Sequence, residues 1–343
     1  MNGLSKDSAT WHEVDAEAAG QRVDNYLTKR LKGVPKSHVY RILRSGEVRV
    51  NSRRVGPEYR VRAGDRLRLP PLRTARPPAA ARQPPAFRLK ADVIYEDEFL
   101  LVINKPSGVA VHGGSGISHG IVELLRLERP DARFLELVHR LDRDTSGVLL
   151  LAKRRSALTA LHRQLREGAV QKLYSVLVKG NWRDNKRSVK LPLHKYVLAS
   201  GERRVAVKGD GSPAHTVFRL ERNWMGCSLL EAELKTGRTH QIRVHLAHLG
   251  FPVAGDDKYG DFALNKQLAR QGLKHMFLHA RKVVIAHPQS GAPLVLEAPL
   301  PGALQSFLSV LDAEEARAAA RGIQYSLKNT PRGGGTEKGG HHG

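Results

Sequence analysis

The sequence predicts an α+β protein with two folded domains. Three observations support this class: short runs that alternate apolar and polar residues, stretches of helical periodicity between them, and one break in composition. The break is a run rich in proline, alanine and arginine over residues 71–91, which is typical of a semi-rigid, extended linker. It separates an N-terminal domain, residues 20–70, from a larger domain, residues 92–315.

Both ends of the chain have the composition of terminal segments. Residues 1–19 are polar and partly acidic, and we expect a poorly ordered tail or an added edge strand there. Residues 316–343 are assigned to the end of an alanine-rich helix and to a disordered, glycine-rich tail.

The charge of the chain points to a polyanionic partner. It has 57 Lys and Arg residues against 33 Asp and Glu residues, a net charge of +24 and an isoelectric point near 10.5. A single cysteine, Cys227, excludes an internal disulfide framework and a cysteine-built zinc site, and it fits a reducing cytoplasm. We expect neither a signal peptide nor a membrane span, and therefore a cytoplasmic protein without a membrane partner.

The N-terminal domain is expected to form two helices followed by short strands. Helical spacing covers residues 20–31, and a second helix is expected to begin near Pro35 and to stop at Gly46. Alternating residues then predict strands around positions 48–50, 59–61 and 67–69. Residues 20–70 contain 14 Lys and Arg against 4 Asp and Glu, which favours phosphate binding over an ordinary solvated face.

In the larger domain a polar loop, His139 to Gly147, lies between two apolar runs. The second run, Val148 to Ala152, is too short to cross a membrane and suits a buried strand. Ser156 is expected to cap the next helix, which ends at Gly168. A loop held between core strands is a common position for catalytic side chains.

Asp142 and Asp144 are the acidic candidates in this loop. Two residues apart in an extended segment, they would point to opposite sides, which argues against two carboxylates acting on one bond. Asp142 lies between Arg140 and Arg143, which should favour its ionised form, and an ionised carboxylate can act as a nucleophile. Asp144 precedes Thr145 and is assigned to the turn. Spacing alone supports a structural salt-bridge loop equally well.

Two further segments carry candidate side chains. Lys172 to Lys179 predicts a strand on which Tyr174 belongs either to the core, as the spacing favours, or to a stacking platform. Residues 234–246 form a second polar cluster, in which Thr239 is expected to cap a helix whose apolar residues face the core while Arg243 leaves from a neighbouring face. His245 and His248 are three residues apart but lack an acidic or cysteine partner, so we expect no metal site.

The N-terminal domain resembles the S-four-type RNA-binding domain, named after a ribosomal protein. The resemblance rests on Arg22 to Asp24, Ser37 to Arg44, Gly46 to Asn51 and Ala63 to Asp65. In that family the second helix and the following turn contact structured RNA. This implies an RNA-binding role for a set of basic residues, namely Arg22, Lys36, Arg41, Arg44, Arg49 and Arg53.

The larger domain resembles the pseudouridine synthases that modify ribosomal RNA. His139 to Gly147 matches the segment H-R-L-D-x-x-T-S-G, and Gly237 to His245 matches G-R-T-H-Q-I-R-V-H. Asn104 to Gly108, Lys172 to Tyr174 and Asp256 to Gly260 fit the same family in the same order. The resemblance implies a mixed, mainly antiparallel sheet with a cleft across it, large-subunit ribosomal RNA as the partner, and a monomer that needs no cofactor.

The resemblance also implies roles for individual residues. Asp142 corresponds to the catalytic nucleophile, Arg243 to its ion-pair partner, and Tyr174 to the residue that packs on the target base. Arg140 corresponds to the side chain that fills the space left when the uridine flips out. Arg238 and His240, in the second motif, are assigned to RNA binding.

Three alternative functions remain open at this stage. The first is a ribosome-assembly factor that binds RNA without catalysis, against which the intact set of Asp142, Tyr174 and Arg243 argues. The second is a pseudouridine synthase that acts on transfer RNA or small-subunit RNA. The third, a glycosidase or nuclease, would need a second acid or a metal cluster that the sequence does not show.

Overall fold

A computed structural model describes residues 8–31, 33–72, 91–113 and 119–320. Almost all of the expected proline-rich linker, the first residues of the N-terminal tail, the glycines at 114–116 and the glycine-rich C-terminal tail lie outside these ranges. Within them, no helix combines the length and the apolar character that crossing a membrane requires.

The N-terminal unit packs two helices against a small antiparallel sheet. The helices are α1 (Val23–Arg30) and α2 (Lys36–Arg44), with a 3-10 turn (Ala16–Ala18) before them. The sheet has the order β1-β4-β2-β3 and comprises β1 (Thr10–Glu13), β2 (Arg49–Val50), β3 (Arg53–Arg54) and β4 (Arg66–Leu69). The expected edge strand near the N-terminus is therefore present as β1, whereas residues 59–61 form only an isolated bridge instead of the expected strand.

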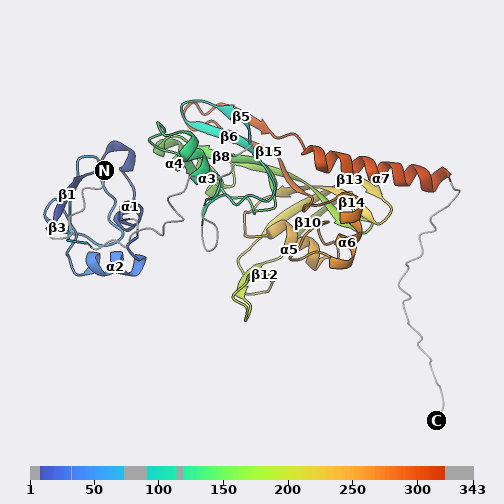
Figure 1. Cartoon of the computed structure of the whole chain (residues 1–343), viewed down its shortest axis with the longest axis horizontal. Coiled ribbons are helices and arrows are strands. Elements are labelled where there is room, and N and C mark those ends of the chain that lie inside the picture. The colour runs from blue at the N-terminus through green and yellow to red at the C-terminus, as the bar shows by residue number, and fades with distance from the viewer. Residues whose placement is uncertain (1–7, 32, 73–90, 114–118, 321–343) are drawn as a thin grey trace, which may run out of the picture.

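The larger unit, labelled in part in Figure 1, is built on a ten-stranded sheet in which eight strands follow the order β10-β13-β14-β9-β15-β8-β6-β5. The remaining two strands lie off this path: β16 pairs with β15, and β7 pairs with β8. The strands are β5 (Asp92–Glu96), β6 (Leu100–Lys105), β7 (Glu136–Leu137), β8 (Ser146–Ala152), β9 (Gln171–Lys179), β10 (Lys186–Lys190), β13 (His215–Trp224), β14 (Cys227–Leu234), β15 (Leu278–Ala286) and β16 (Pro293–Glu297).

This sheet is mixed and mainly antiparallel, as the family resemblance implies. The pair β8 and β15 is parallel, and every other registered pair among the described strands is antiparallel. At the parallel pair, Gly147 lies opposite Ala280 with φ +108°, and a Cβ atom on it would stand 2.2 Å from the Ala280 carbonyl oxygen. Only glycine permits this approach, which draws the start of β8 against β15.

Strand β8 is buried along its whole length because both faces of the sheet are covered. Leu149 and Leu151 belong to a core with α3 (Ile121–Glu128) and α5 (Gln241–His248). Val148, Leu150 and Ala152 belong to a second core with α4 (Arg155–Glu167) on the opposite face. This burial on two sides explains why the strand reads as a continuous apolar run rather than an alternating one.

Helix α4 ends as expected but begins differently. Gly168 adopts the left-handed conformation at its C-terminal end, with φ +72°. The expected cap at Ser156 is wrong, because Arg154 is the N-cap residue and makes no side-chain capping hydrogen bond. Ser156 instead lies inside the first turn of the helix.

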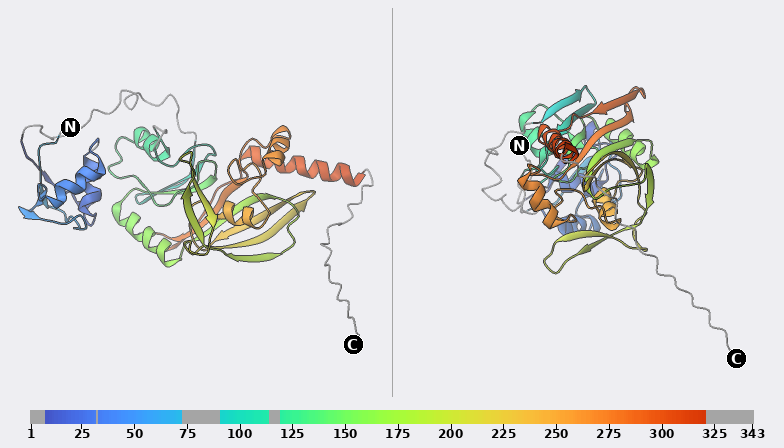
Figure 2. Two further views of the ribbon diagram at one scale, coloured as in Figure 1. Left: turned by 90° about the horizontal axis from the view of Figure 1, so that it is seen from below. Right: turned by 90° about the vertical axis from the view of Figure 1, so that its right-hand side faces the viewer.

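A hairpin and two helices complete the larger unit. Strands β11 (Leu193–Val197) and β12 (Arg203–Val207) form a separate antiparallel hairpin that projects away from the large sheet in Figures 1 and 2. Helices α6 (Phe262–Arg270) and α7 (Gly302–Ala320) share a further core with Trp224 at the far end of β13. The hairpin is the element that matters for the site below.

Candidate active site

A cavity of about 770 Å³ lies over the centre of the sheet. The loop before β8, the start of β9 and the start of α5 meet there, although they are far apart in the sequence. They meet because β9 and β8 flank β15 in the sheet. The polar side chains that line the cavity include His139, Arg140, Asp142, Lys172, Tyr174, Arg238, His240 and Arg243.

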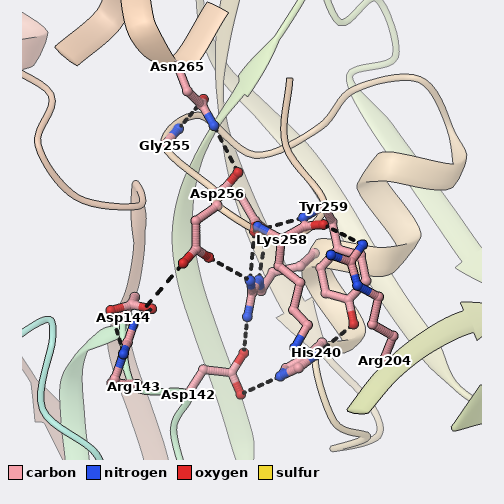
Figure 3. Close-up of polar contacts among 12 residues, drawn as sticks. Asp142, Arg143, Asp144, Arg204, His240, Gly255, Asp256, Lys258, Tyr259 and Asn265 are labelled. Carbon is pink, nitrogen blue, oxygen red and sulfur yellow. Dashed lines mark hydrogen bonds and ion pairs between the residues drawn. The ribbon is translucent and has the colours of Figure 1, made fainter. Parts of the chain in front are cut away.

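Arg243 joins two carboxylates, those of Asp142 and Asp256, which are both labelled in Figure 3. Its Nη1 donates to Asp142 Oδ2 at 3.1 Å, while its Nε and Nη2 bind the two carboxylate oxygens of Asp256 at 2.7 and 2.6 Å. The backbone N–H groups of Lys258 and Tyr259 also donate to Asp256. Because the guanidinium group is planar, the fork on Asp256 fixes the direction in which Nη1 points toward Asp142.

The Arg243–Asp256 pair is ionic in spite of its burial. Arg243 is 4% exposed and Asp256 is fully buried. Burial raises the pKa of Asp256, but the hydrogen bonds and charge of Arg243 and two backbone N–H groups outweigh it, so the pKa of Asp256 lies below its ordinary value. Burial lowers the pKa of Arg243, but Asp256 and Asp142 together raise it above the ordinary value. The pair is therefore a rigid, charged support behind Asp142.

Asp142 itself faces the cavity with its side chain 22% exposed. The arginines that flank it in the sequence are not the ones that pair with it. Arg143 instead binds Asp144 at 3.2 Å, and Arg140 is exposed at the rim of the cavity. Within the described ranges the basic partners of Asp142 are Arg243 and His240, which approach different oxygens.

The N-terminus of α5 differs from the expected capped helix. The expected Thr239 cap is wrong: His240 is the N-cap residue, with a left-handed backbone (φ +54°, ψ 22°) and no capping hydrogen bond from its side chain. This conformation is unfavourable for a residue with a side chain, at a cost on the order of 1–3 kcal/mol. In return it turns the imidazole of His240 toward Asp142, with Nε2 at 3.8 Å from Oδ1.

Tyr174 lies on β9 between Ala232 of β14 and Ala280 of β15. It is 7% exposed and belongs to the core beneath the cavity, but it also lines the cavity wall. Burial, helped by the negative charge of Asp142, raises the pKa of its hydroxyl well above the usual value. Tyr174 is therefore a core residue whose neutral ring also forms part of the cavity wall.

The loop that carries Asp142 is held from below by Lys105, which is fully buried at the end of β6. Its Nζ donates to the carbonyl oxygens of Pro106, Val109 and Arg143, each at 2.8 Å. The Ser107 hydroxyl donates to the Asp144 carbonyl at 2.8 Å. Through these contacts, the matched segment Asn104 to Gly108 holds the backbone of the loop in place.

His245 contacts protein groups through both ring nitrogens. Nδ1 lies 3.0 Å from the Thr216 hydroxyl and Nε2 lies 3.0 Å from the Leu191 carbonyl oxygen. His245 is fully buried, whereas His248, at the last position of the helix, is exposed. These contacts explain His245 as a packing residue.

The basic residues expected to bind RNA in the N-terminal unit fall into two groups. Arg22 forms a two-point contact with buried Asp24, and Arg41 pairs with Glu47 at 3.0 Å. The other group is exposed and forms no ion pair with the described residues: Lys36, Arg44, Arg49 and Arg53. The second group is therefore the part of the surface whose charge is free for a polyanion.

The comparisons with known proteins now give the class. The sequence pattern of the RNA pseudouridylate synthases matches residues 99–248, and the pattern of the S-four domain matches residues 21–67. Relatives are 52–54% identical to this chain over 87% of its length. The chain therefore belongs to the RNA pseudouridine synthase family.

Two relatives carry the same name, ribosomal large subunit pseudouridine synthase C. The protein of that name from Salmonella typhimurium is 54% identical over 303 residues, which cover 87% of this chain and 95% of the relative. The one from Pasteurella multocida is 52% identical over 301 residues, with 87% and 92% covered.

Solved structures show the same fold. Human RNA pseudouridylate synthase domain containing 1 superposes with a TM-score of 0.53 at 24% identity, over 64% of this chain and 87% of the human chain. The human domain containing 4 superposes with a TM-score of 0.52 at 25% identity, over 64% and 92%.

Three residues of the site were assigned no role from the sequence, although each lies in a matched segment: Asp256, Lys105 and Tyr259. Asp256 is 114 positions from Asp142, and only the fold brings the two to the same guanidinium group. The one sequence signal for Asp256 was its position, because it is an acidic residue in a matched segment that follows the matched Arg243. Charge pairing between distant segments is not readable from spacing.

Proposed function

We propose that this protein converts uridines of large-subunit ribosomal RNA, at more than one site, to pseudouridine, with Asp142 as the nucleophile. The observation that carries the proposal is the Asp142 carboxylate, presented to a cavity and held at Oδ2 by an arginine that is itself fixed on Asp256. A carboxylate so supported can act as a nucleophile. The names of the relatives support large-subunit ribosomal RNA as the substrate.

The proposed reaction requires no oxidation or reduction by a cofactor. The uracil is detached from the ribose, turned, and rejoined through carbon, so no net oxidation occurs and the base stays in the pocket. Asp142 can attack either the uracil ring or the anomeric carbon, and the cavity of about 770 Å³ has room for a nucleotide to turn. Tyr174 supplies a flat wall for the base, and Arg243 stabilises the carboxylate before attack and again when the bond between Asp142 and the substrate is broken.

A base inside structured RNA must first leave its stack, which costs a few kcal/mol. We assign the exposed Arg140, at the rim of the cavity, to the gap that the flipped uridine leaves. Arg238 and His240 are assigned to the RNA near the target. The exposed Lys36, Arg44, Arg49 and Arg53 provide phosphate contacts that offset the cost.

The organisation of the chain follows from this division of labour. We assign RNA placement to a domain over residues 20–70 and the chemistry to a domain over residues 92–315, acting as a monomer in the cytoplasm. The two units have separate apolar cores, which supports this division. The charge of +24 supports a nucleic-acid partner for the whole chain.

The deciding experiment maps pseudouridines in RNA from cells that lack this protein. We expect particular pseudouridines of large-subunit ribosomal RNA to disappear, to return with the wild-type gene, and to stay absent with Asp142→Asn. An unchanged ribosomal map combined with a loss in transfer RNA would move the substrate to that RNA. Maps that are unchanged in every RNA, together with a defect in ribosome assembly, would support a non-catalytic RNA-binding factor.

A further inference from the structure

His240 lies between the candidate nucleophile and a tyrosine, and its ring nitrogens face one each. Nδ1 is 2.8 Å from the Tyr259 hydroxyl oxygen, and Nε2 is 3.8 Å from Asp142 Oδ1. Figure 3 shows the imidazole spanning the space between the two side chains. The protonation of the ring therefore decides what Asp142 meets at Oδ1.

The direction of the Tyr259 hydrogen bond follows from its other contact. A phenol hydroxyl has one proton to donate and can accept hydrogen bonds as well. The backbone N–H of Val205, on β12, donates to the Tyr259 oxygen at 3.0 Å. Among the side-chain contacts of the described chain, His240 Nδ1 is the one acceptor that Tyr259 reaches with its proton. Tyr259 therefore donates to Nδ1.

A ring that accepts at Nδ1 carries its proton at Nε2, because a neutral imidazole has one N–H group. Burial lowers the pKa of His240, and although the Asp142 charge acts in the other direction, the neutral ring is favoured. Burial also raises the pKa of Tyr259, so the hydroxyl keeps the proton it donates. The Nε2–H group then points at the carboxylate oxygen that Arg243 leaves free.

We propose that His240 is a positioning residue: Tyr259 holds it as the Nε2–H tautomer, and this N–H group orients Oδ1 of Asp142 for attack. The proposal rests on Asp142 being the nucleophile. Arg243 binds Oδ2 and His240 faces Oδ1, so the orientation of the Asp142 carboxylate is restricted on both sides. A movement of about 0.8 Å, as when RNA enters the cavity, brings Nε2 within hydrogen-bond length.

The left-handed backbone of His240 makes a sharp test possible. Asparagine tolerates a positive φ better than glutamine does, so a purely structural role favours His240→Asn over His240→Gln. The amide nitrogen of glutamine can take the place of Nε2–H, whereas that of asparagine reaches only the place of Nδ1. A positioning role through Nε2–H therefore favours the glutamine variant.

The rates to compare are single-turnover rates on large-subunit ribosomal RNA transcribed in vitro, at saturating enzyme. We expect His240→Gln to be at least about tenfold faster than His240→Asn, with both variants folded and bound to RNA. The control His248→Asn changes an exposed histidine of the same helix and should match the wild type. Equal rates for the two His240 variants, or a faster asparagine variant, would overturn the proposal.

A second measurement does not depend on activity. The ¹⁵N chemical shifts of the histidine rings, with His240 identified by its absence in His240→Gln, should show Nε2 protonated and Nδ1 unprotonated at pH 7.5. In Tyr259→Phe the preference for protonation at Nε2 should be lost, because the hydroxyl group is removed. The aromatic ring at position 259, which packs against Arg243, is kept. A wild-type ring protonated at Nδ1 would refute the inference. A wild-type enzyme that forms no pseudouridine would refute the proposed function and leave the tautomer measurable.

Discussion

Arg243 is the residue on which the site depends, because it holds both the support and the candidate nucleophile. Three of its hydrogen bonds go to two carboxylates, one buried and one facing the cavity. The neighbouring Asp144 has a different environment, in which Arg143 binds its carboxylate and Ser107 donates to its carbonyl oxygen. The two aspartates of the loop therefore have different partners.

This difference predicts unequal effects of the same substitution. Asp142→Asn keeps the size of the side chain but removes the nucleophile, so pseudouridine formation should fall at least about 10⁴-fold while RNA binding persists. Asp144→Asn is the matched control and should lose less than about tenfold. Single-turnover measurements at saturating enzyme separate chemistry from binding. An Asp142→Asn variant that reacts at nearly the wild-type rate would rule out this assignment.

At the scale of elements, the parallel contact between β8 and β15 is what places the loop. The contact needs Gly147, whose φ of +108° and lack of a Cβ atom let the Ala280 carbonyl approach. Lys105 at the end of β6 then holds the loop backbone through three carbonyl groups. The position of Asp142 is thus set by backbone contacts rather than by its sequence neighbours.

Gly147→Ala should destabilise the protein by about 3 kcal/mol, because the new methyl group meets backbone atoms and the backbone is strained. Urea unfolding, followed by circular dichroism, measures the loss. Gly302→Ala is the control: nothing lies within 4 Å of the added atom, and the change should stay within about 0.5 kcal/mol. Equal stability of the two variants would contradict the close approach of β8 and β15.

At the scale of the whole molecule, basic charge is densest in the N-terminal unit, whereas the candidate active site lies in the larger unit. The core of the N-terminal unit contains residues 14–72 only, and the other cores are formed by residues beyond position 90. The N-terminal domain supplies +10 of the net charge with about fifty residues. It can therefore add affinity without contributing to the fold of the catalytic unit.

Deleting residues 1–91 should leave a folded protein that binds ribosomal RNA more weakly. The slope of log affinity against log salt should flatten, by roughly 0.7–0.9 for each phosphate contact that is lost. Fluorescence anisotropy at several salt concentrations gives the slope, and circular dichroism checks the fold. A deletion variant with the wild-type slope would show that the N-terminal unit does not bind phosphates.

Stability should also fall on mild acidification, because burial lowers the pKa of several histidines: His12, His139, His215, His240, His245 and His279. Between their folded pKa values and about 6.5, the unfolded chain binds more protons than the folded one. The free energy of unfolding therefore decreases as the pH falls through this window. Most carboxylates titrate below it, so a comparison of pH 7.5 with pH 5 reports mainly on histidines.

His139, whose pKa burial and the nearby Lys172 lower to about 4, should account for on the order of 2 kcal/mol of this decrease. His139→Gln keeps an acceptor for the Leu150 N–H group and takes up no proton, so it should reduce the pH dependence. The exposed His248→Asn should not change it. Equal urea midpoints for the wild type at the two pH values would contradict the expectation.

The sequence by itself determined most of the local structure and the class of the protein. The all-apolar run before Ala152, the glycine after α4 and the period-two pattern around Tyr174 each correspond to an element of the structure. Such patterns are short-range, because burial and turn chemistry are written in neighbouring residues. The family motifs identified the class for the same reason, since each of them is contiguous.

Only the tertiary structure decided which side chains meet. It brought Asp142 to Arg243, the partner that the family resemblance implies, and not to the neighbouring Arg140 or Arg143, and it placed Asp256 behind that pair. It also gave His240 a left-handed backbone where Thr239 was expected to start an ordinary helix. Contacts across a hundred residues depend on strand order and register, and strain is stable only when the surrounding fold enforces it. Neither is expressed in the spacing of residues along the chain.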